Sequence, residues 1–411
     1  MNRTLVIVPI TTQAEDITWP SFKKNVLDVL KADLALCIQT PENYDDTNPY
    51  WQFAKYRWTT PKYEDWNSLL DEAQGIELER LKRKDIVDWR QLFALAGNWL
   101  GAAHDGEKKR PGSGVILIYF RWLLHQYLVA ENLLNQYDRF IITRADFFWQ
   151  CPHPPLEFLS PDKIWLGDGE SWGGISDRHT VLSRQNIEAY LGIGSQILTD
   201  PDGLLAEMRF RSEWNIEQYI AHSLARLGLR DQVAYFPYAM YLVRAKDAGP
   251  TWSPGQWNEA LGYFIKYPNE LASAQELANI IQSPSDWQVF FLGSYHCLFK
   301  ALVLNSDGNA LAFDGEKYTP IDVKAIGTFY IDALLIDCLG STGRLYVGQS
   351  KYGEHIRAHI ADVEIEEVNN GAYILKTLGQ NSYYGVDQEG RLVTLDEPVY
   401  QFQFANRYLM A

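Results

Sequence analysis

The residues best placed to do chemistry follow directly after a run of apolar, strand-forming side chains. Phe140–Ile142 leads into Thr143, Arg144 and Asp146, and aromatic residues follow at once. A short apolar run of this kind is typical of a buried strand in an α/β sheet. Open α/β sheets bind their ligands just beyond the carboxyl ends of the strands. We therefore expect Asp146 to lie in a ligand site, with Arg144 beside it.

A second group of candidate residues lies in the glycine- and acid-rich segment Gly167–His179. Trp172 can lie flat against the face of a sugar ring. The glycines that allow a close approach of the backbone are Gly169, Gly173 and Gly174. The carboxylates that could take part in proton transfer are Asp168, Glu170 and Asp177. A turn salt bridge between Asp177 and Arg178 is an equally simple explanation for that pair, and both interpretations stay open.

A third group of acids begins a predicted helix, Glu213–Leu227. Ser212 is a suitable N-cap for it, and carboxylates in a first turn are stabilised by the helix dipole. The start of the helix therefore explains Glu213 and Glu217 without a role in proton transfer.

The apolar runs predict an α/β fold around these residues. Thr4–Ile10 and Leu34–Ile38 are expected to be strands, and Trp19–Leu30 a helix between them, which implies a parallel pair with a right-handed crossover. The further predicted helices are Trp66–Leu81, Asp85–Leu100, Val115–Gln136 and Ala272–Ile281. The further predicted strands are Tyr137–Trp149, Lys163–Leu166, Thr180–Ser183 and Val233–Tyr241. Asn43–Trp66 is expected to be a loop with short helical pieces. Gly101–Gly114 is expected to be a solvated surface loop, with a lid as the less favoured alternative.

The pattern changes to short β-type segments separated by turns from about Trp287 onwards. Leu311–Phe313, Leu345–Val347 and Tyr384–Val386 each follow an apolar strand and a turn, which suggests a repeated unit and a β-trefoil. We therefore predict an α/β domain over residues 1–270, a helical linker over 271–286 and an all-β, trefoil-like domain over 287–411.

Composition limits the class of partner. The chain has 411 residues and a formal net charge of −15 at pH 7, without a long Lys/Arg run, so its average field would repel nucleic acid or an anionic membrane surface. A local pocket could still bind a small phosphorylated ligand. The four scattered cysteines fit a reduced, cytoplasmic chain. The apolar run Val115–Leu134 carries four polar or charged residues that a transmembrane segment would not, namely Arg121, His125, Gln126 and Glu131.

Residues 1–270 resemble the nucleotide-sugar glycosyltransferases of the GT-A type, in particular bacterial and large-DNA-virus members with Arg-x-Asp in place of the usual Asp-x-Asp. The residues that carry this resemblance are Tyr137–Asp146, Pro152, Pro154, Pro155 and Gly167–His179. The resemblance implies a nucleotide-sugar donor and a divalent cation, Mn²⁺ or Mg²⁺, held by Asp146 beside the diphosphate. Arg144 stands where the family has its first acid, so it either contacts phosphate itself or pairs with Asp146.

The resemblance also assigns roles to the other candidates. The end of the first strand, at Pro9 and Thr11, is expected beside the nucleotide. The residues expected in the acceptor pocket are Trp172, Gly173, Gly174 and Arg178. The candidates for the general base that takes the proton of the acceptor hydroxyl are Asp177 and Glu170, with Glu217 or Glu213 in reserve.

The sequence thus favours a glycosyltransferase with a glycan or other hydroxyl acceptor, and a C-terminal domain that binds carbohydrate. The alternative is a non-catalytic carbohydrate-binding protein with a degenerate transferase domain, suggested by Arg144 and the β repeat. A glycoside hydrolase is less favoured, because spacing singles out no pair of carboxylates. The motifs of NTPases, dehydrogenases and serine hydrolases do not occur in the sequence.

Overall fold

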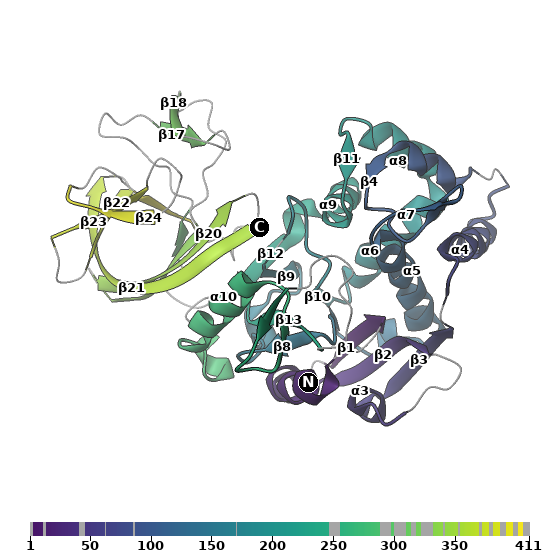
Figure 1. Ribbon diagram of the computed structural model, residues 1–411, viewed down its shortest axis with the longest axis horizontal. Coiled ribbons are helices and arrows are strands. Elements are labelled where there is room, and N and C mark those ends of the chain that lie inside the picture. Colours follow the sequence, from purple (N-terminus) through teal and green to yellow (C-terminus); the bar gives the residue numbers. More distant parts are fainter. Residues whose placement is uncertain are drawn as a thin grey trace.

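A computed structural model of the chain describes residues 3–10, 14–40, 46–61, 63–84, 87–169, 171–245 and 255–287, and then separate β-segments between 297 and 405. Two of the predicted site residues, Thr11 and Glu170, lie outside the described residues. Figure 1 shows the helices and strands of the α/β part beside the C-terminal strands, with β21 (Glu354–Asn369) running next to α10 (Pro268–Ala278).

The α/β part is built on a seven-stranded sheet in the order β12-β9-β10-β7-β1-β2-β3. Its strands are β1 (Thr4–Ile10), β2 (Asp33–Thr40), β3 (Tyr56–Pro61), β7 (Arg139–Ile142), β9 (Ile164–Asp168), β10 (Thr180–Ser183) and β12 (Val233–Pro237). They run parallel except β10, which is antiparallel to β7 and β9. The chain winds from β1 to β3 on one side and continues from β7 on the other, so the strand order reverses between β1 and β7. Such a switch point leaves a crevice at the carboxyl ends of the two strands.

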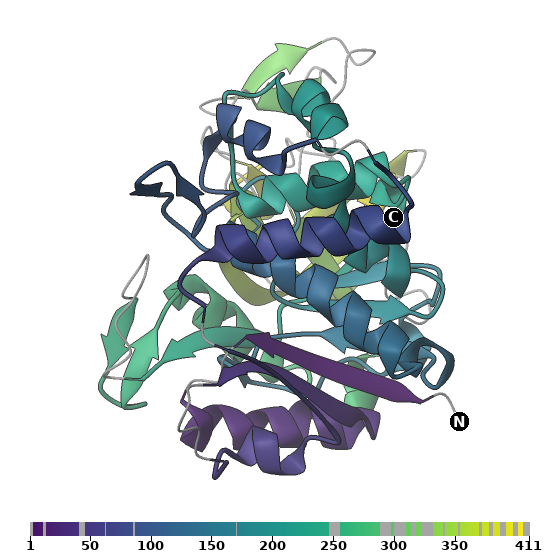
Figure 2. The same cartoon turned by 90° about the vertical axis from the view of Figure 1, so that its right-hand side faces the viewer.

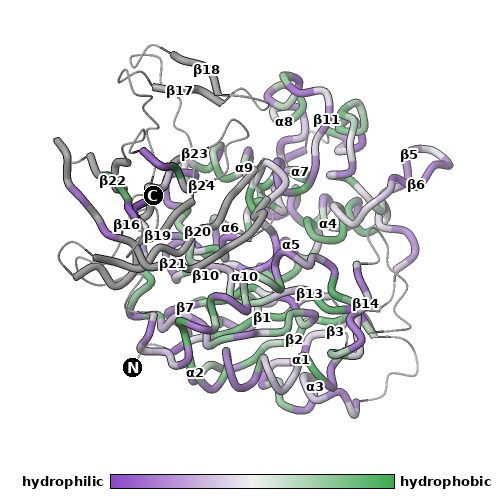
Figure 3. Tube along the Cα trace, turned by 60° about the vertical axis from the view of Figure 1, so that its left-hand side comes forward, coloured by the Kyte–Doolittle hydropathy of each residue, from purple (hydrophilic) through white to green (hydrophobic). Residues whose placement is uncertain are grey.

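Both faces of this sheet are covered by helices and buried. Successive side chains of a strand point to opposite faces, so each strand contributes to both cores. Leu5 and Ile7 of β1 pack with the helices α4 (Trp66–Arg80) and α5 (Gly114–Ala130), whereas Val6 and Val8 pack with α1 (Glu15–Phe22) and α3 (Pro49–Phe53). Figure 2 shows β1 to β3 between these two layers of helices, and Figure 3 shows hydrophobic stretches both in the central strands and in the helices around them. None of the helices in the described part of the chain is long and apolar enough to span a membrane.

The remaining helices on the same side of the sheet as α4 and α5 are shorter. They are α6 (Ile187–Leu191), α7 (Ile193–Thr199), α8 (Pro201–Met208) and α9 (Ile216–Arg226). The predicted helix Trp19–Leu30 begins earlier, as α1, and continues through a π-helical turn, Lys23–Leu27, into α2 (Asp28–Leu30).

A second, four-stranded sheet begins where β7 ends. Its order is β14-β15-β13-β8, and its strands are β8 (Phe147–Trp149), β13 (Met240–Arg244), β14 (Gln256–Asn258) and β15 (Tyr263–Ile265). The predicted strand Tyr137–Trp149 is therefore two strands in two sheets, and Val233–Tyr241 is likewise divided between β12 and β13. The polar residues Thr143–Asp146 form the connection between the sheets, which places the Arg-x-Asp element at their junction.

Three local predictions were wrong because pairing with distant segments decided the structure. Asp85–Leu100 is a 3₁₀ turn, Trp89–Ala94, followed by β4 (Ala96–Gly97). β4 pairs with β11 (Glu213–Trp214), so the helix predicted from Glu213 begins only after Asn215. Asn43–Trp66 contains a short helix, α3, as expected, but it also contains β3, the edge strand of the central sheet, which was not predicted.

The loop predicted at Gly101–Gly114 is largely irregular. It carries a small hairpin of β5 (His104–Asp105) and β6 (Lys108–Lys109), and it runs directly into α5.

The C-terminal segments are strands, as predicted. Besides β21 they are β16 (Cys297–Phe299), β17 (Ala310–Phe313), β18 (Tyr318–Ile321), β19 (Asp332–Leu339), β20 (Thr342–Lys351), β22 (Ala372–Thr377), β23 (Tyr383–Val386), β24 (Leu392–Leu395) and β25 (Phe402–Ala405). Eight of them pair in the order β21-β20-β19-β16-β25-β22-β23-β24, and the pairing of β21 with β22 closes a ring that leaves β23 and β24 outside it; β17 and β18 pair with each other in a separate sheet. The three segments of the suggested repeat lie in β17, β20 and β23, which pair differently, so a trefoil stays a prediction.

Candidate functional site

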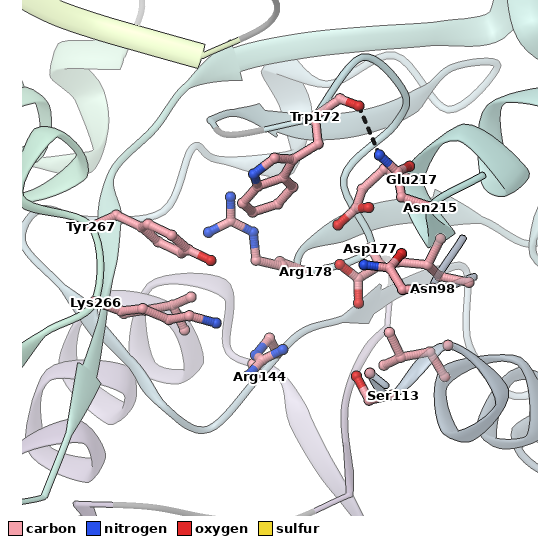
Figure 4. A pocket seen from close by; sticks show the side chains of 15 residues that line it. Asn98, Ser113, Arg144, Trp172, Asp177, Arg178, Asn215, Glu217, Lys266 and Tyr267 are labelled. Carbon is pink, nitrogen blue, oxygen red and sulfur yellow. Dashed lines mark hydrogen bonds between the residues drawn. The ribbon is translucent and has the colours of Figure 1, made fainter. Parts of the chain in front are cut away.

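A cavity of about 370 Å³ lies beyond the carboxyl end of β7, beside the first turns of α5 and α9. Figure 4 shows the side chains around it. They come from distant parts of the chain: Asn98, Gly112, Ser113, Gly114, Leu117, Arg144, Trp172, Asp177, Arg178, Asn215, Ile216, Glu217, Leu242, Lys266 and Tyr267. The structure thus brings five of the predicted site residues into one cavity, namely Arg144, Trp172, Asp177, Arg178 and Glu217.

One side of this cavity is cationic. Arg144, Arg178 and Lys266 point into it from three segments, after β7, before β10 and after β15 (Figure 4). Burial, together with the neighbouring guanidinium groups of Arg144 and Arg244, lowers the pKa of Lys266 to about 8. The amine still carries most of its positive charge at pH 7. We call Arg144, Arg178 and Lys266 the cationic wall.

Asp146 lies behind this wall and is buried, with 4% of its surface exposed. Arg144 donates to both carboxylate oxygens, from Nε to Oδ1 at 2.8 Å and from Nη2 to Oδ2 at 2.7 Å. Arg244, at the end of β13, donates to Oδ2 as well. Burial alone would raise the pKa of Asp146, but the two guanidinium groups outweigh it and hold that pKa well below its usual range.

These contacts do not fit the divalent cation that the sequence resemblance implies. Both oxygens of Asp146 already accept from arginines, and the described residues contain no group of three or more His, Cys, Asp or Glu side chains that could hold a metal ion. Mg²⁺ and Mn²⁺ prefer several oxygen ligands, most of them from carboxylates, phosphates and water. Metal binding by Asp146 stays a prediction for which the surrounding donor set gives no support.

Arg178 is the most enclosed member of the cationic wall, with 3% of its surface exposed. Its Nη1 donates to Oε1 of Glu270 on α10 at 2.6 Å. The guanidinium carbon lies 5.0 Å from the ring centroid of Trp172 and 5.3 Å from that of Tyr267. An ion pair and two aromatic rings therefore fix the orientation of Arg178 before any ligand binds.

The opposite side of the cavity carries two acids, Asp177 and Glu217 (Figure 4). Glu217 is the second residue of α9, whose N-cap is Asn215 and not the predicted Ser212; Asn215 and Gln218 form a capping box. Burial and, to a smaller extent, the negative charge of Asp177 together raise the pKa of Glu217 to about 7. We call Asp177 and Glu217 the acid pair. A carboxyl group that titrates near neutral pH can accept a proton under physiological conditions.

Two glycines follow Trp172 where the chain lies against the start of α9. A Cβ on Gly174 would overlap the backbone carbonyl of Glu217, so only glycine allows this approach. Gly173 has a φ of +75°, which favours glycine, although a Cβ there would have room. Asn215 Nδ2 donates to the carbonyl oxygen of Trp172 at 3.0 Å, which fixes Trp172 above the cavity (Figure 4).

The other predicted site residues lie elsewhere. Pro9 is at the carboxyl end of β1 and half-buried, and it is not among the residues that line the cavity. Glu213, named as a reserve base, is exposed in β11 and does not line the cavity either, so the structure removes it from the site. No sequence motif indicated Lys266, Tyr267 or Asn98 as site residues. Lys266 and Tyr267 reach the cavity through the pairing of the second sheet, and Asn98 through the pairing of β4 with β11.

A buried pair of histidines supports the end of β7. His179 Nδ1 lies 2.9 Å from Thr143 Oγ1, and the Nε2 atoms of His179 and His153 are 3.3 Å apart. His153 Nδ1 donates to the carbonyl oxygen of Pro154 at 2.7 Å, so one assignment of protons satisfies every contact with both rings neutral. Burial lowers the pKa of His153 to about 4. The pair is a structural support that fixes Thr143, next to Arg144.

No protein-family model matches the sequence, and no curated protein sequence matches it. Among the solved structures whose fold the chain matches is mouse xyloside xylosyltransferase 1 in its apo form, at 11% sequence identity and a TM-score of 0.31. The match covers 57% of this chain and 85% of the mouse chain. A likeness this distant carries no argument about the reaction, which has to come from the residues of the cavity.

Proposed function

We propose that the protein is a glycosyltransferase that moves a sugar from a nucleotide-sugar donor to the hydroxyl group of a glycan or other acceptor. The observation that carries this proposal is the cavity beyond the carboxyl end of β7, with its cationic wall facing the acid pair. The parallel central sheet with a switch between β1 and β7 is consistent with the GT-A-like domain that the sequence resemblance implies.

The cationic wall suits the diphosphate of the donor. Each phosphate of a nucleotide sugar carries a negative charge, and the leaving nucleoside diphosphate gains a further charge as the bond to the sugar breaks. Arg144, Arg178 and Lys266 offer positive charge at one place in a chain whose net charge is −15. Preorganised cations at the point where negative charge develops lower the barrier to its formation.

The acid pair suits the acceptor. In a single displacement, the acceptor oxygen attacks the anomeric carbon, its proton passes to the carboxylate of Glu217, and the electron pair of the anomeric C–O bond leaves with the nucleoside diphosphate. Glu217 is the better candidate for the general base because its pKa, raised to about 7 by burial and by Asp177, lies near the pH at which it would act. Trp172 and Tyr267 are flat surfaces on which a sugar ring can stack.

Two other functions use part of the same site. A glycoside hydrolase also employs two carboxylates, but it binds a neutral glycan and has no need of the cationic wall. A non-catalytic carbohydrate-binding protein is suggested by the two arginines that occupy both oxygens of Asp146. The acid pair, with a carboxyl group whose pKa is raised, favours an enzyme over that alternative.

The test is a screen of nucleotide sugars with simple glycosides as acceptors, scored by release of nucleoside diphosphate and by the mass of the product. Glu217→Gln should lower the rate by about 10²- to 10⁴-fold. Glu213→Gln, which removes an exposed acid close by in the sequence, should leave it unchanged. A protein that turns over no donor, or equal rates for the two variants, would contradict the proposal; glycan binding without turnover would favour the non-catalytic alternative.

A further inference from the structure

The contacts of Asp146 raise the question of what neutralises the donor diphosphate. A divalent cation at Asp146 would have to displace the bidentate contact of Arg144 or the contact of Arg244. It would also lie close to Lys266, whose pKa is already lowered to about 8 by burial and by Arg144 and Arg244. Placing a further double positive charge there would increase the repulsion among groups that are already crowded.

The charges around Asp146 favour an anion instead. Four cationic side chains gather here, and two carboxylates pair with them; the paired groups are Asp146 with Arg144 and Arg244, and Glu270 with Arg178. Lys266 adds its charge without replacing any of these contacts. Two positive charges therefore remain in excess on this side of the cavity, which matches the one negative charge on each phosphate of a nucleotide sugar.

The contact with Asp146 also sets the geometry of Arg144. It uses Nε and Nη2 of the guanidinium group, which leaves Nη1 for a ligand in the cavity that Arg144 lines. Arg244 does not line the cavity, so its role is to share the charge of Asp146. Asp146 thus acts as a positioning residue for a phosphate-binding arginine.

We propose that the cavity binds the diphosphate of its nucleotide-sugar donor through Arg144, Arg178 and Lys266 without a divalent cation, and that Asp146 positions Arg144 and is not a metal ligand. This inference rests on the proposed function, because it concerns the donor half of the same site. It differs from the expectation of Mn²⁺ or Mg²⁺ that the sequence resemblance implies.

The experiment is a calorimetric titration of the full chain with UDP, GDP, dTDP and ADP, first in EDTA and then with Mn²⁺ or Mg²⁺. We expect one of these nucleotides to bind in EDTA, with a Kd that the metal changes less than about threefold. Lys266→Met should weaken this binding by about tenfold to a hundredfold, the effect of losing one hydrogen bond to a charged group. Lys163→Met, which removes an amine outside the cavity, should have no effect.

Asp146→Asn separates the two roles of Asp146 most sharply. If Asp146 were a metal ligand, Asp146→Asn would lose only the affinity that Mn²⁺ or Mg²⁺ adds, and it would bind nucleotide in EDTA as the unaltered protein does. If Asp146 positions Arg144, the amide of the variant can no longer accept from both Nε and Nη2, so the variant binds nucleotide more weakly in EDTA and the metal does not restore the affinity. Binding that requires Mn²⁺ or Mg²⁺, or binding that Lys266→Met does not weaken, would overturn the inference and leave the proposed function standing. Binding of no nucleotide under either condition would overturn the proposed function itself.

Discussion

Replacing Asp177 by Asn should move the pH dependence of the reaction to lower pH. The pKa of Glu217 is raised to about 7, first by burial and then by the charge of Asp177. A general base has to be ionised in the free enzyme, so kcat/KM should rise with pH up to about pH 7, and it should fall again above about pH 8 as Lys266 loses the charge that contacts the donor. Removing the charge of Asp177 should lower the pH at which half of the maximal kcat/KM is reached.

The size of this change follows from the two causes. A pKa that moves from 4.5 to about 7 corresponds to roughly 3 kcal/mol of preference for the protonated carboxyl. Burial, the larger cause, is the same in Asp177→Asn. We therefore expect a change of roughly one pH unit, the size that one neighbouring charge usually produces, and not a return to the ordinary pKa of a glutamate.

The assay is the initial rate of nucleoside diphosphate release at low donor and acceptor concentrations, measured from pH 5 to pH 9. Glu217→Gln should remove the dependence on a group with a pKa near 7 altogether. Glu213→Gln serves as the control for removing an acid outside the cavity. A profile that is flat around pH 7 in the unaltered protein, or one that Asp177→Asn leaves in place, would refute the assignment of Glu217 as the base.

Three further predictions concern stability and packing. The pKa of Glu217 is raised in the folded state, so the stabilisation of the fold by the protonated carboxyl is present below about pH 4.5 and is lost as the pH rises through about 7. Glu217→Gln should therefore be more stable to urea than the unaltered protein at pH 8, by up to about 3 kcal/mol, and should show no gain at pH 4.5. Gly174→Ala should lower both kcat/KM and the unfolding midpoint, since the added Cβ overlaps the backbone of Glu217. Gly173→Ala should keep activity and cost only about 1–2 kcal/mol of backbone strain. Equal effects of the two variants on activity would contradict the role given to Gly174. Arg178→Met leaves buried Glu270 without its ion-pair partner and should cost about 3–5 kcal/mol in the same unfolding assay, most of which Arg178→Met/Glu270→Leu should restore; a double variant no more stable than the single one would refute this account.

The core of the fold could be predicted from the sequence because its signals are local. β1 occupies Thr4–Ile10 as predicted, and α4 and α5 lie where amphipathic or strongly apolar runs indicated helices. The polar residues that interrupt an apolar strand at Thr143 and Arg144 indicated the ligand edge of the sheet. The structure places Arg144 in the cavity together with Asp177 and Glu217, although their roles stay predictions.

The rest depends on pairing between segments that are distant in the sequence. The helical spacing of Asp85–Leu100 was overridden because Ala96–Gly97 pairs with Glu213–Trp214, more than a hundred residues later. The same pairing moves the start of α9 to Asn215 and so brings Glu217 to the cavity. Lys266 carries no motif of its own, and its place beside Arg144 follows only from the pairing of β15 with β13 and of β13 with β8.

Asp146 connects the two sheets as well as the two arginines, and this bears on how the Arg-x-Asp element should be interpreted. Its backbone carbonyl accepts from the backbone N–H of Val243 at 3.0 Å, and its carboxylate holds Arg144 from the first sheet and Arg244 from the second. Replacing it by a neutral residue would leave two guanidinium groups facing each other where strands of both sheets meet. The charges of the two arginines are therefore enough to account for an aspartate at this position. The aspartate is then no evidence for a metal site by itself, and Arg144, which it orients, is the residue of the element that lines the cavity.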